Sequence, residues 1–261
     1  LKGYKDLKKR EKTLSGVAVR SSATAEDLPD ASFAGQHESY LNVQGEDELL
    51  EAWKKCVASL FTDRAIKYRE ENDFEHMKVA LSVGVQKMVR ADKASAGVAF
   101  TIDPDSGFEN VILINGAWGL GENVVQGTVR NDESYLFKEA LKNDKDPILS
   151  KSIGTKKKMM VYRKSAKNGE TTRNKRTPKK KRKAFVLNDD ELVQLGKWCL
   201  EIEQHYDKPM DIEWAKDGDS DELYIVQARP ETVHSSKEKT NKLKKYSLKK
   251  QDKEPIVTGV G

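Results

Sequence analysis

The stretch that decides the fold reads Asp211-Ile212-Glu213-Trp214-Ala215 and, one turn later, Ile225-Val226-Gln227-Ala228-Arg229-Pro230. Each half has the branched or alternating side chains of a strand. The residues between them, 216–221, read Lys-Asp-Gly-Asp-Ser-Asp and are rich in turn formers. The pattern predicts an antiparallel β-hairpin.

Four polar side chains of this hairpin are expected to share one face, because side chains on a strand repeat with period two. They are Asp211 and Glu213 on the first strand, and Gln227 and Arg229 on the second. Carboxylate and amide oxygens suit Mg²⁺, which usually keeps substrate phosphates among its ligands, and arginine binds phosphate in a bidentate fork. The face therefore suits Mg²⁺ with a bound polyphosphate, although an ordinary hairpin with a surface salt bridge fits the same spacing.

A second segment, residues 17–35, begins with a small apolar strand that delivers Arg20 into a loop of hydroxyl-bearing and small residues. Such a loop lets backbone amides and an arginine side chain approach phosphate oxygens closely. We therefore expect a further set of phosphate contacts here, far from the hairpin in sequence.

Together with further stretches, these segments resemble the ATP-grasp nucleotide-binding region of the phosphoenolpyruvate synthase and pyruvate phosphate dikinase family. The matching text includes residues 58–65, 84–100, 117–127 and 209–233, and it covers most of residues 14–235. Related modules occur in the glucan water dikinases and in rifampin phosphotransferase. The resemblance implies an α+β fold in which two lobes clasp the nucleotide. It also implies an incomplete first lobe, because the family's N-terminal, lysine-bearing part has no counterpart here.

The resemblance assigns the base-binding and phosphate-closing segments. It implies a hinge beside the adenine, where backbone groups of Met88 and Val89 meet the base edge and Gln86 or Lys87 assists. A plain core strand is the alternative for this hinge. The turn at 92–97 resembles the family's small-residue loop that closes over the phosphates, and its contacting residues would be Ser95, Ala96 and Gly97.

The resemblance also assigns the charged residues. Arg20 and Arg229 would bind phosphates and stabilise charge that develops during transfer. Glu213 and Gln227 would coordinate Mg²⁺, with Asp211 as a possible second carboxylate. Phosphoryl transfer needs mostly positioning and charge neutralisation, so a site of arginines and metal ligands without an obvious nucleophile suits it.

The segment Gly119–Gly127 also matches the family, where it forms part of the nucleotide-site wall. As a glycine pattern alone it is weak, since it lacks the lysine of a P-loop. Glu122 could reach the ribose or a metal, or the glycines could serve only tight packing. At 130–133 the chain reads Arg-Asn-Asp-Glu where the family typically has Asn-Pro-Asp-Glu, which puts the role of Asp132 in doubt.

Composition places the basic residues in two stretches. Residues 156–183 hold fourteen Lys or Arg against one acidic residue, and residues 236–261 hold eight lysines against three acidic residues. We interpret the insertion 156–183 as a solvated, lysine-biased loop. A polyanion patch at 179–183 is the alternative, but nucleic acid is not the expected partner because no aromatic residues interleave with it. No apolar run reaches membrane-span length, so a cytoplasmic protein without membrane contact is expected.

Hydrophobic periodicity predicts the order of the elements. It indicates one long amphipathic helix over 46–71, strands over 79–89, 96–101 and 111–115, and a second long helix over 189–206. The charged residues 1–13 are not expected to pack alone. Cys56 falls on the apolar face of the first helix, where it should pack as a small apolar residue.

The resulting domain prediction has three parts. Residues 1–72 would form the C-terminal part of the first lobe, residues 73–235 the second lobe with the insertion 156–183, and residues 236–261 a basic linker. The linker would lead toward a phosphohistidine domain, because residues 256–261 resemble the start of one.

Function beyond the chain follows only from the resemblance. None of the four histidines sits in the family's phosphohistidine setting, and the pyruvate-binding barrel is also missing. The chain is therefore expected to be an internal fragment, the phosphoryl-donor module of an enzyme that converts ATP, pyruvate and water to AMP, phosphoenolpyruvate and phosphate. ATP and the phosphohistidine domain would be its partners, with pyruvate reached only through the missing C-terminal domain. The alternatives are a module with a rifamycin or glucan acceptor, and a non-catalytic, truncated binding module.

Overall fold

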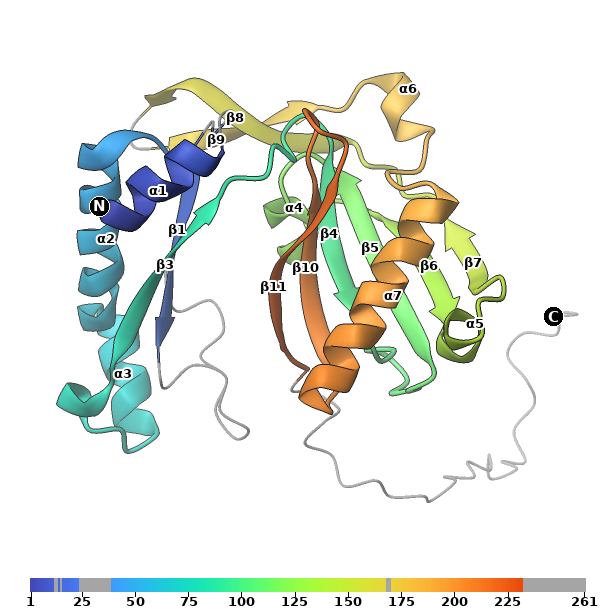
Figure 1. The fold of residues 1–261 in the computed structure, drawn as a ribbon, viewed down its shortest axis with the longest axis horizontal. Coiled ribbons are helices and arrows are strands. Elements are labelled where there is room, and N and C mark those ends of the chain that lie inside the picture. Colours follow the sequence, from blue (N-terminus) through green and yellow to red (C-terminus); the bar gives the residue numbers. More distant parts are fainter. Residues whose placement is uncertain (12–13, 15, 24–38, 168–169, 232–261) are drawn as a thin grey trace, which may run out of the picture.

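Two larger sheets, of three and six strands, are each covered by helices on one face, and a two-stranded hairpin forms a third sheet (Figure 1). The computed structural model describes residues 1–11, 14, 16–23, 39–167 and 170–231. The two larger sheets lie in two lobes that are joined by the segment after β3 and by the long hairpin (Figure 1). The chain is thus an α+β protein, as the sequence predicts. In the described residues no helix is long and apolar enough to cross a membrane.

The first lobe is built around strand β1 (Val17–Ala23). β2 (Ser39–Val43) and β3 (Leu81–Lys87) flank it, both antiparallel. The buried side chains of β1, Val17 and Val19, pack with helix α2 (Gly45–Ala58) and with Cys56, which is buried as expected. The first sheet therefore extends past residue 72, where the sequence analysis ended the first lobe.

The prediction of one helix over 46–71 is wrong. After α2 the chain forms the 3₁₀ turn η1 (Ser59–Phe61), and α3 (Asp63–Glu71) then begins anew. Thr62 is extended, and its Oγ1 accepts a hydrogen bond from the backbone N–H of Ala65 at 3.3 Å, so it caps the new helix. Hydrophobic spacing continues across this break, which is why periodicity alone did not reveal it.

The N-terminal residues form a helix that does not stand alone. Helix α1 (Lys2–Arg10) carries mostly charged side chains, but it buries Tyr4 against the first lobe. The Tyr4 hydroxyl accepts a hydrogen bond from the backbone N–H of Gly45, the first residue of α2. A second short turn, η2 (His76–Lys78), precedes β3.

The second lobe is a six-stranded antiparallel sheet in the order β11-β10-β4-β5-β6-β7. Its strands are β4 (Ser95–Phe100), β5 (Val111–Trp118), β6 (Asp132–Phe137), β7 (Ile148–Ser152), β10 (Met210–Lys216) and β11 (Leu223–Pro230). Helices α5 (Lys138–Lys142) and α7 (Asp189–Tyr206) pack with it, and the short α4 (Glu122–Val125) follows β5. The sheet supplies a rigid platform for the candidate site.

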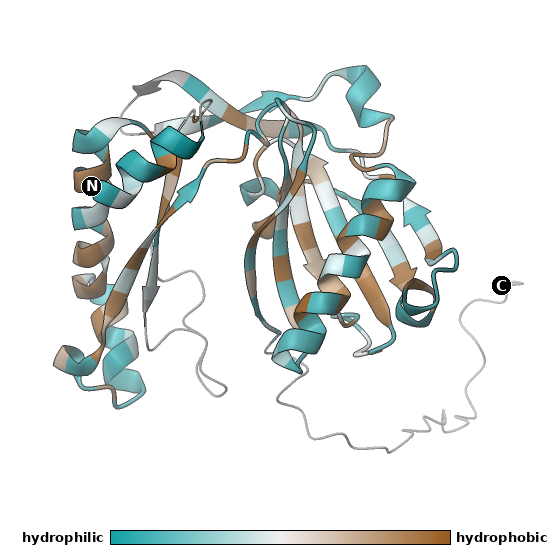
Figure 2. Ribbon diagram, viewed as in Figure 1, coloured by the Kyte–Doolittle hydropathy of each residue, from teal (hydrophilic) through white to brown (hydrophobic). Residues whose placement is uncertain are grey.

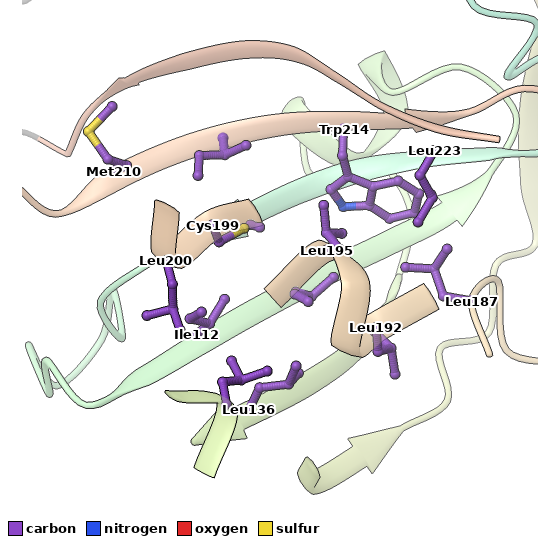
Figure 3. Close-up of a cluster of buried hydrophobic side chains, with 14 of the residues drawn as sticks. Ile112, Leu136, Leu187, Leu192, Leu195, Cys199, Leu200, Met210, Trp214 and Leu223 are labelled. Atoms are coloured by element: carbon purple, nitrogen blue, oxygen red, sulfur yellow. The ribbon is translucent and has the colours of Figure 1, made fainter. Parts of the chain in front are cut away.

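Hydrophobic and hydrophilic residues alternate along several strands of the six-stranded sheet (Figure 2). Trp214 of β10 lies on the side of the sheet that α7 covers, with Ile112, Leu195 and Cys199 (Figure 3). Ile212 belongs to the same buried cluster. The intervening residues of β10 therefore point to the opposite face of the sheet. The helix that covers the core begins at Asn188, which forms a capping box with Glu191.

The lysine-rich segment is not the loop that we expected. It forms the hairpin β8 (Lys158–Lys167) and β9 (Glu170–Arg176), followed by helix α6 (Lys179–Arg182). The hairpin crosses from the second lobe toward the first (Figure 1). Met160 anchors the hairpin to the second lobe. Its side chain is buried, and its carbonyl accepts a hydrogen bond from Leu120 N–H at 3.0 Å.

Candidate nucleotide-binding site

A cavity of about 270 Å³ lies between the two lobes. The first lobe contributes the face of β1 opposite its core, with Ala18 and Arg20, and the second lobe contributes β4, β10 and α4. The segment that joins β3 to β4 closes one side. Residues from all these elements line the cavity, including Gln86, Lys87, Met88, Val89, Ala96, Gly97, Leu120, Glu122, Glu213 and Val226.

One end of the cavity is an apolar slot along the joining segment, the predicted hinge. Val89, Ala96 and Leu120 belong to one buried cluster, with Met88 and Val226 packed against it. Met88 N–H is bonded to the carbonyl of Gly16 at 3.1 Å. Val89 N–H finds no acceptor in the part of the chain that the structure describes. An apolar slot with one available backbone donor suits a flat heteroaromatic base.

The two side chains that precede this slot make contacts within the protein. Gln86 Nε2 donates to the carbonyl of Val226 at 3.3 Å, across the lobes. Lys87 Nζ pairs with Glu11 at 2.7 Å and lies 5.5 Å from the Tyr224 ring. The hydrogen bond to Glu11 raises the pKa of Lys87. Both residues therefore line the cavity while helping to hold its walls together.

The other end of the cavity is charged, and Arg20 spans it. This side chain reaches from β1 to β11, where Nη1 donates to the carbonyl of Val226 at 2.9 Å and Nη2 donates to Gln227 Oε1. Nη2 is also 3.8 Å from Glu213 Oε2. The arginine predicted for one phosphate loop and two residues predicted for the hairpin thus come together from segments about 200 residues apart.

The hairpin face forms as predicted. β10 and β11 pair in antiparallel register, with Asp211 opposite Arg229 and Glu213 opposite Gln227. Arg229 donates from Nε and Nη2 to Asp211 Oδ2, at 2.9 and 2.7 Å. Asp211, Gln227 and Arg229 are outside the cavity lining, whereas Glu213 is part of it. Asp211 and Arg229 thus form a salt bridge beside the cavity. Glu213 and Gln227 lie at the charged end of the cavity.

Glu213 has a perturbed ionisation equilibrium. Burial raises the pKa of its carboxyl group and the charge of Asp211 adds to this, while Arg20 and Arg229 act in the opposite direction. The net shift is upward, so the site is costly for an uncompensated carboxylate. An additional cation close to Glu213 would offset that cost.

The residues at this end fit a divalent cation whose coordination is completed by other ligands. Glu213 and Gln227 are paired across neighbouring strands, and carboxylate and amide oxygens are the hard ligands that Mg²⁺ prefers. Gln227 Oε1 accepts a hydrogen bond from Arg20 Nη2, which would have to release it to a cation. The Asp211 carboxylate is occupied by Arg229. Among the described residues, no three His, Cys, Asp or Glu side chains cluster with metal-binding geometry. Phosphate oxygens and water would therefore have to supply the remaining ligands.

The resemblance predicts a small-residue loop over residues 92–97. This prediction is wrong for residues 95–97, which belong to a strand. Ser95, Ala96 and Gly97 lie within β4, in the middle of the sheet. Ser95 is buried and its hydroxyl donates to the carbonyl of Val186 at 3.4 Å, away from the cavity. Ala96 and Gly97 line the cavity as part of its wall. A Cβ on Gly97 would collide with the backbone of Asn115 on β5, so glycine is required for strand packing.

The segment Gly119–Gly127 packs tightly at Gly119 and also lines the cavity. Gly119 has φ +90°, and a Cβ there would collide with the Met160 backbone. Glu122, three residues later, lines the cavity, and burial raises the pKa of its carboxyl group. Packing glycines thus place an acidic side chain on the wall of the cavity.

Asp132, whose role the sequence left in doubt, is a buried structural residue. Its carboxylate accepts hydrogen bonds from Lys156 Nζ, from Gly154 N–H at 2.7 Å and from Val186 N–H at 2.9 Å. The Lys156 side chain is 0% exposed although it belongs to the lysine-rich segment. Sequence reasoning missed this pair because the lysine run hides one buried member among exposed ones.

These features define a class of site: a cavity between two α+β lobes with an apolar base slot at one end and an arginine–carboxylate cluster at the other. The family described as "Pyruvate phosphate dikinase, AMP/ATP-binding domain" matches residues 1–250. The chain therefore belongs to this family of nucleotide-binding domains.

Several curated relatives are similar over nearly all of the chain. The phosphoenolpyruvate synthase of Helicobacter pylori is 56% identical over 255 residues, which are 93% of this chain and 31% of that protein. The corresponding enzyme of Aquifex aeolicus is 53% identical over 96% of this chain, and that of Escherichia coli is 51% identical over 92%. This chain covers 30% of each of these two enzymes. The chain thus spans about a third of the length of these relatives.

Proposed function

We propose that this chain is the ATP-binding, phosphoryl-donor module of a phosphoenolpyruvate synthase of the pyruvate, water dikinase type, and that its two lobes form an ATP-grasp fold. In the whole enzyme, ATP, pyruvate and water would yield AMP, phosphoenolpyruvate and phosphate. The phosphoryl group would pass through a histidine on a separate domain of the same enzyme, and pyruvate would bind in a further domain. The whole enzyme would be cytoplasmic. The observation that carries the proposal is Arg20 of the first lobe facing Glu213 and Gln227 of the second, beside the apolar slot.

The cavity residues would share the work of binding ATP. The adenine ring would lie in the slot against Leu120 and Met88, with Val89 N–H donating to the base edge. Glu122 would accept hydrogen bonds from the ribose hydroxyls. The triphosphate would then extend to the charged end of the cavity. This division follows the chemistry of the two ends.

At the charged end, Arg20 would exchange Glu213 for a phosphate group, and Arg229 beside it would add positive charge. Glu213 and Gln227 would hold Mg²⁺, with Asp211 keeping Arg229 oriented. When bound, Mg²⁺ would supply charge neutralisation to the phosphates. Phosphoryl transfer gains most from such positioning and charge compensation.

Calorimetric titration of the chain with ATP tests the proposal. We expect binding that requires Mg²⁺ and that weakens about tenfold in Glu213→Ala, since a charge-assisted contact contributes about 1.5–3 kcal/mol. Glu201→Ala, an exposed glutamate on α7, is the matched control and should bind as the wild type does. A folded wild-type chain that binds no ATP would overturn the proposal.

The pH dependence of binding tests the Glu213 carboxylate separately. Because burial raises the Glu213 pKa, the carboxylate is lost at a higher pH than for an ordinary glutamate as the solution is acidified. Affinity for Mg²⁺–ATP should therefore fall with decreasing pH, beginning above the ordinary range of glutamate, and Glu213→Gln should remove this component. ATP also titrates, but it does so equally with both proteins, so the difference between the two profiles isolates Glu213. Identical profiles would exclude this role.

A further inference from the structure

The turn between β10 and β11, residues 217–222, is hydrogen-bonded to the hinge, the segment that joins β3 to β4, from outside the cavity. Asp217 is 5% exposed, and its Oδ2 accepts a hydrogen bond from Arg90 N–H at 3.1 Å. The next residue, Gly218, donates its N–H to the Arg90 carbonyl at 3.2 Å. Both backbone polar groups of Arg90 are therefore held by two consecutive residues of the turn.

The Asp217 carboxylate is fully used in this turn. Its other oxygen, Oδ1, accepts from the N–H groups of Asp219 and Ser220, at 2.7 and 3.3 Å. Burial opposes ionisation, but the backbone hydrogen bonds from Arg90, Asp219 and Ser220 outweigh it and lower the Asp217 pKa. One ionised side chain thus accepts one hydrogen bond from the hinge, at Arg90 N–H, and two from its own turn, at the N–H groups of Asp219 and Ser220.

Close packing of the turn and an ion pair within the hinge also fix this part of the structure. A Cβ on Gly218 would collide with Lys93, so the turn can approach the hinge only with glycine at this position. The Arg90 side chain is bound to Asp92 through Nε and Nη2, at 2.8 and 2.9 Å, and lies 5.9 Å from the Tyr162 ring. Arg90 is thus fixed in both backbone and side chain.

We propose that Asp217 is a positioning residue for recognition of the base. It holds the Arg90 peptide, and through it the neighbouring Val89 N–H, in the orientation that meets the base edge. Asp217 is not among the residues that line the cavity, so it acts through the hinge and not on the nucleotide. The inference rests on the proposed function, because it assumes that the slot takes adenine.

An asparagine at position 217 would keep the shape of the side chain but not its bonding. An amide has a single acceptor oxygen, whereas the carboxylate accepts on both oxygens. In either orientation the asparagine NH₂ group would face an N–H donor, of Arg90 or of the turn. The hinge peptide should therefore lose its fixed position while the charged end of the cavity keeps its residues.

The experiment compares base binding with phosphate binding in the full 261-residue chain. Calorimetry would measure the affinities for ATP, GTP and inorganic tripolyphosphate, each with Mg²⁺. In Asp217→Asn we expect the affinity for ATP to fall about tenfold, the preference for ATP over GTP to shrink, and the affinity for tripolyphosphate to stay within about twofold. General damage to the lobe would weaken all three ligands.

Asp219→Asn is the matched control, because it makes the same substitution in the same turn. The Asp219 carboxylate is more than half exposed and pairs with Lys93 Nζ at 2.6 Å. Its variant should retain both the affinity for ATP and the preference for it. If Asp217→Asn does not fold, Gly218→Ala tests the same contact, since its methyl group would push the turn off the hinge.

The outcomes separate the inference from the proposed function. A selective loss of ATP affinity in either Asp217→Asn or Gly218→Ala supports it. Unchanged ATP affinity in a folded Asp217→Asn, or an equal loss for ATP and tripolyphosphate, overturns it while the proposed function stands. If both variants fail to fold, hydrogen exchange of the wild type tests the contact instead. An Arg90 amide that exchanges as fast as exposed amides would contradict its hydrogen bond to Asp217 and overturn the inference. A wild-type chain that binds tripolyphosphate but shows no preference for ATP also overturns it, and one that binds neither overturns the proposed function as well.

Discussion

Replacing Arg20 with alanine should lower the affinity for Mg²⁺–ATP about a hundredfold, a loss of about 2.7 kcal/mol. The Arg20 guanidinium contacts the Val226 carbonyl, Gln227 and Glu213, all on the opposite lobe. The variant therefore loses a phosphate ligand and a contact between lobes, and it leaves the partly buried Glu213 carboxylate less compensated. Removing one partner of a buried charge pair typically costs about 2–5 kcal/mol. The side chains of Arg20 and Glu213 are 26% and 30% exposed, so the expected loss lies in the lower part of that range. Calorimetric titration with ATP and Mg²⁺ measures the effect.

Two further variants show which property of Arg20 matters. Arg20→Lys keeps the charge but loses the planar fork, so its affinity should lie between those of the wild type and Arg20→Ala. Arg64→Ala removes an exposed arginine from α3 of the same lobe and should leave binding unchanged. If Arg20→Ala folds and binds ATP within threefold of the wild type, Arg20 is not a phosphate ligand.

The charged end of the cavity was accessible to sequence reasoning because it depends on short-range regularities. Period-two alternation places Asp211 and Glu213 on one face of a strand, and the turn between 216 and 222 brings Gln227 and Arg229 opposite them. The structure confirms this hairpin. The contact of Arg20 with Glu213 and Gln227 was expected from the resemblance and not from the residue pattern, since no local rule joins residues about 200 positions apart.

The features that were missed depend on tertiary contacts. Asp217 was interpreted only as a turn former, because its bond to the Arg90 peptide joins two turns that are distant in sequence. The break at Thr62 lies within a continuous hydrophobic period. The β8–β9 hairpin looked like a solvated run because its many lysines obscure the buried methionines of its anchor. In each of these three cases the local sequence pattern was compatible with several structures, so the pattern alone could not select the one that forms.

The second large effect concerns stability and not binding. Asp132→Ala should lower the free energy of unfolding by about 3–5 kcal/mol, because breaking a buried ion pair leaves an uncompensated charge. The side chains of Lys156 and Asp132 are 0% and 4% exposed. The substitution also removes the acceptor for the N–H groups of Gly154 and Val186, which join β6 to the segments before β8 and α7. Chemical denaturation followed by tryptophan fluorescence measures the change.

Glu139→Ala is the matched control, since Glu139 also pairs with a lysine, Lys142, at 2.7 Å, but at the surface. Such exposed pairs contribute about 0–1 kcal/mol, so this variant should be nearly as stable as the wild type. Adding Lys156→Met to Asp132→Ala should recover part of the loss, because the buried ammonium is removed, but not all of it, because two backbone N–H groups still lack their acceptor. If Asp132→Ala is no less stable than Glu139→Ala, the buried pair does not hold the second lobe together. A double variant as unstable as the single one would instead assign the loss to the backbone hydrogen bonds.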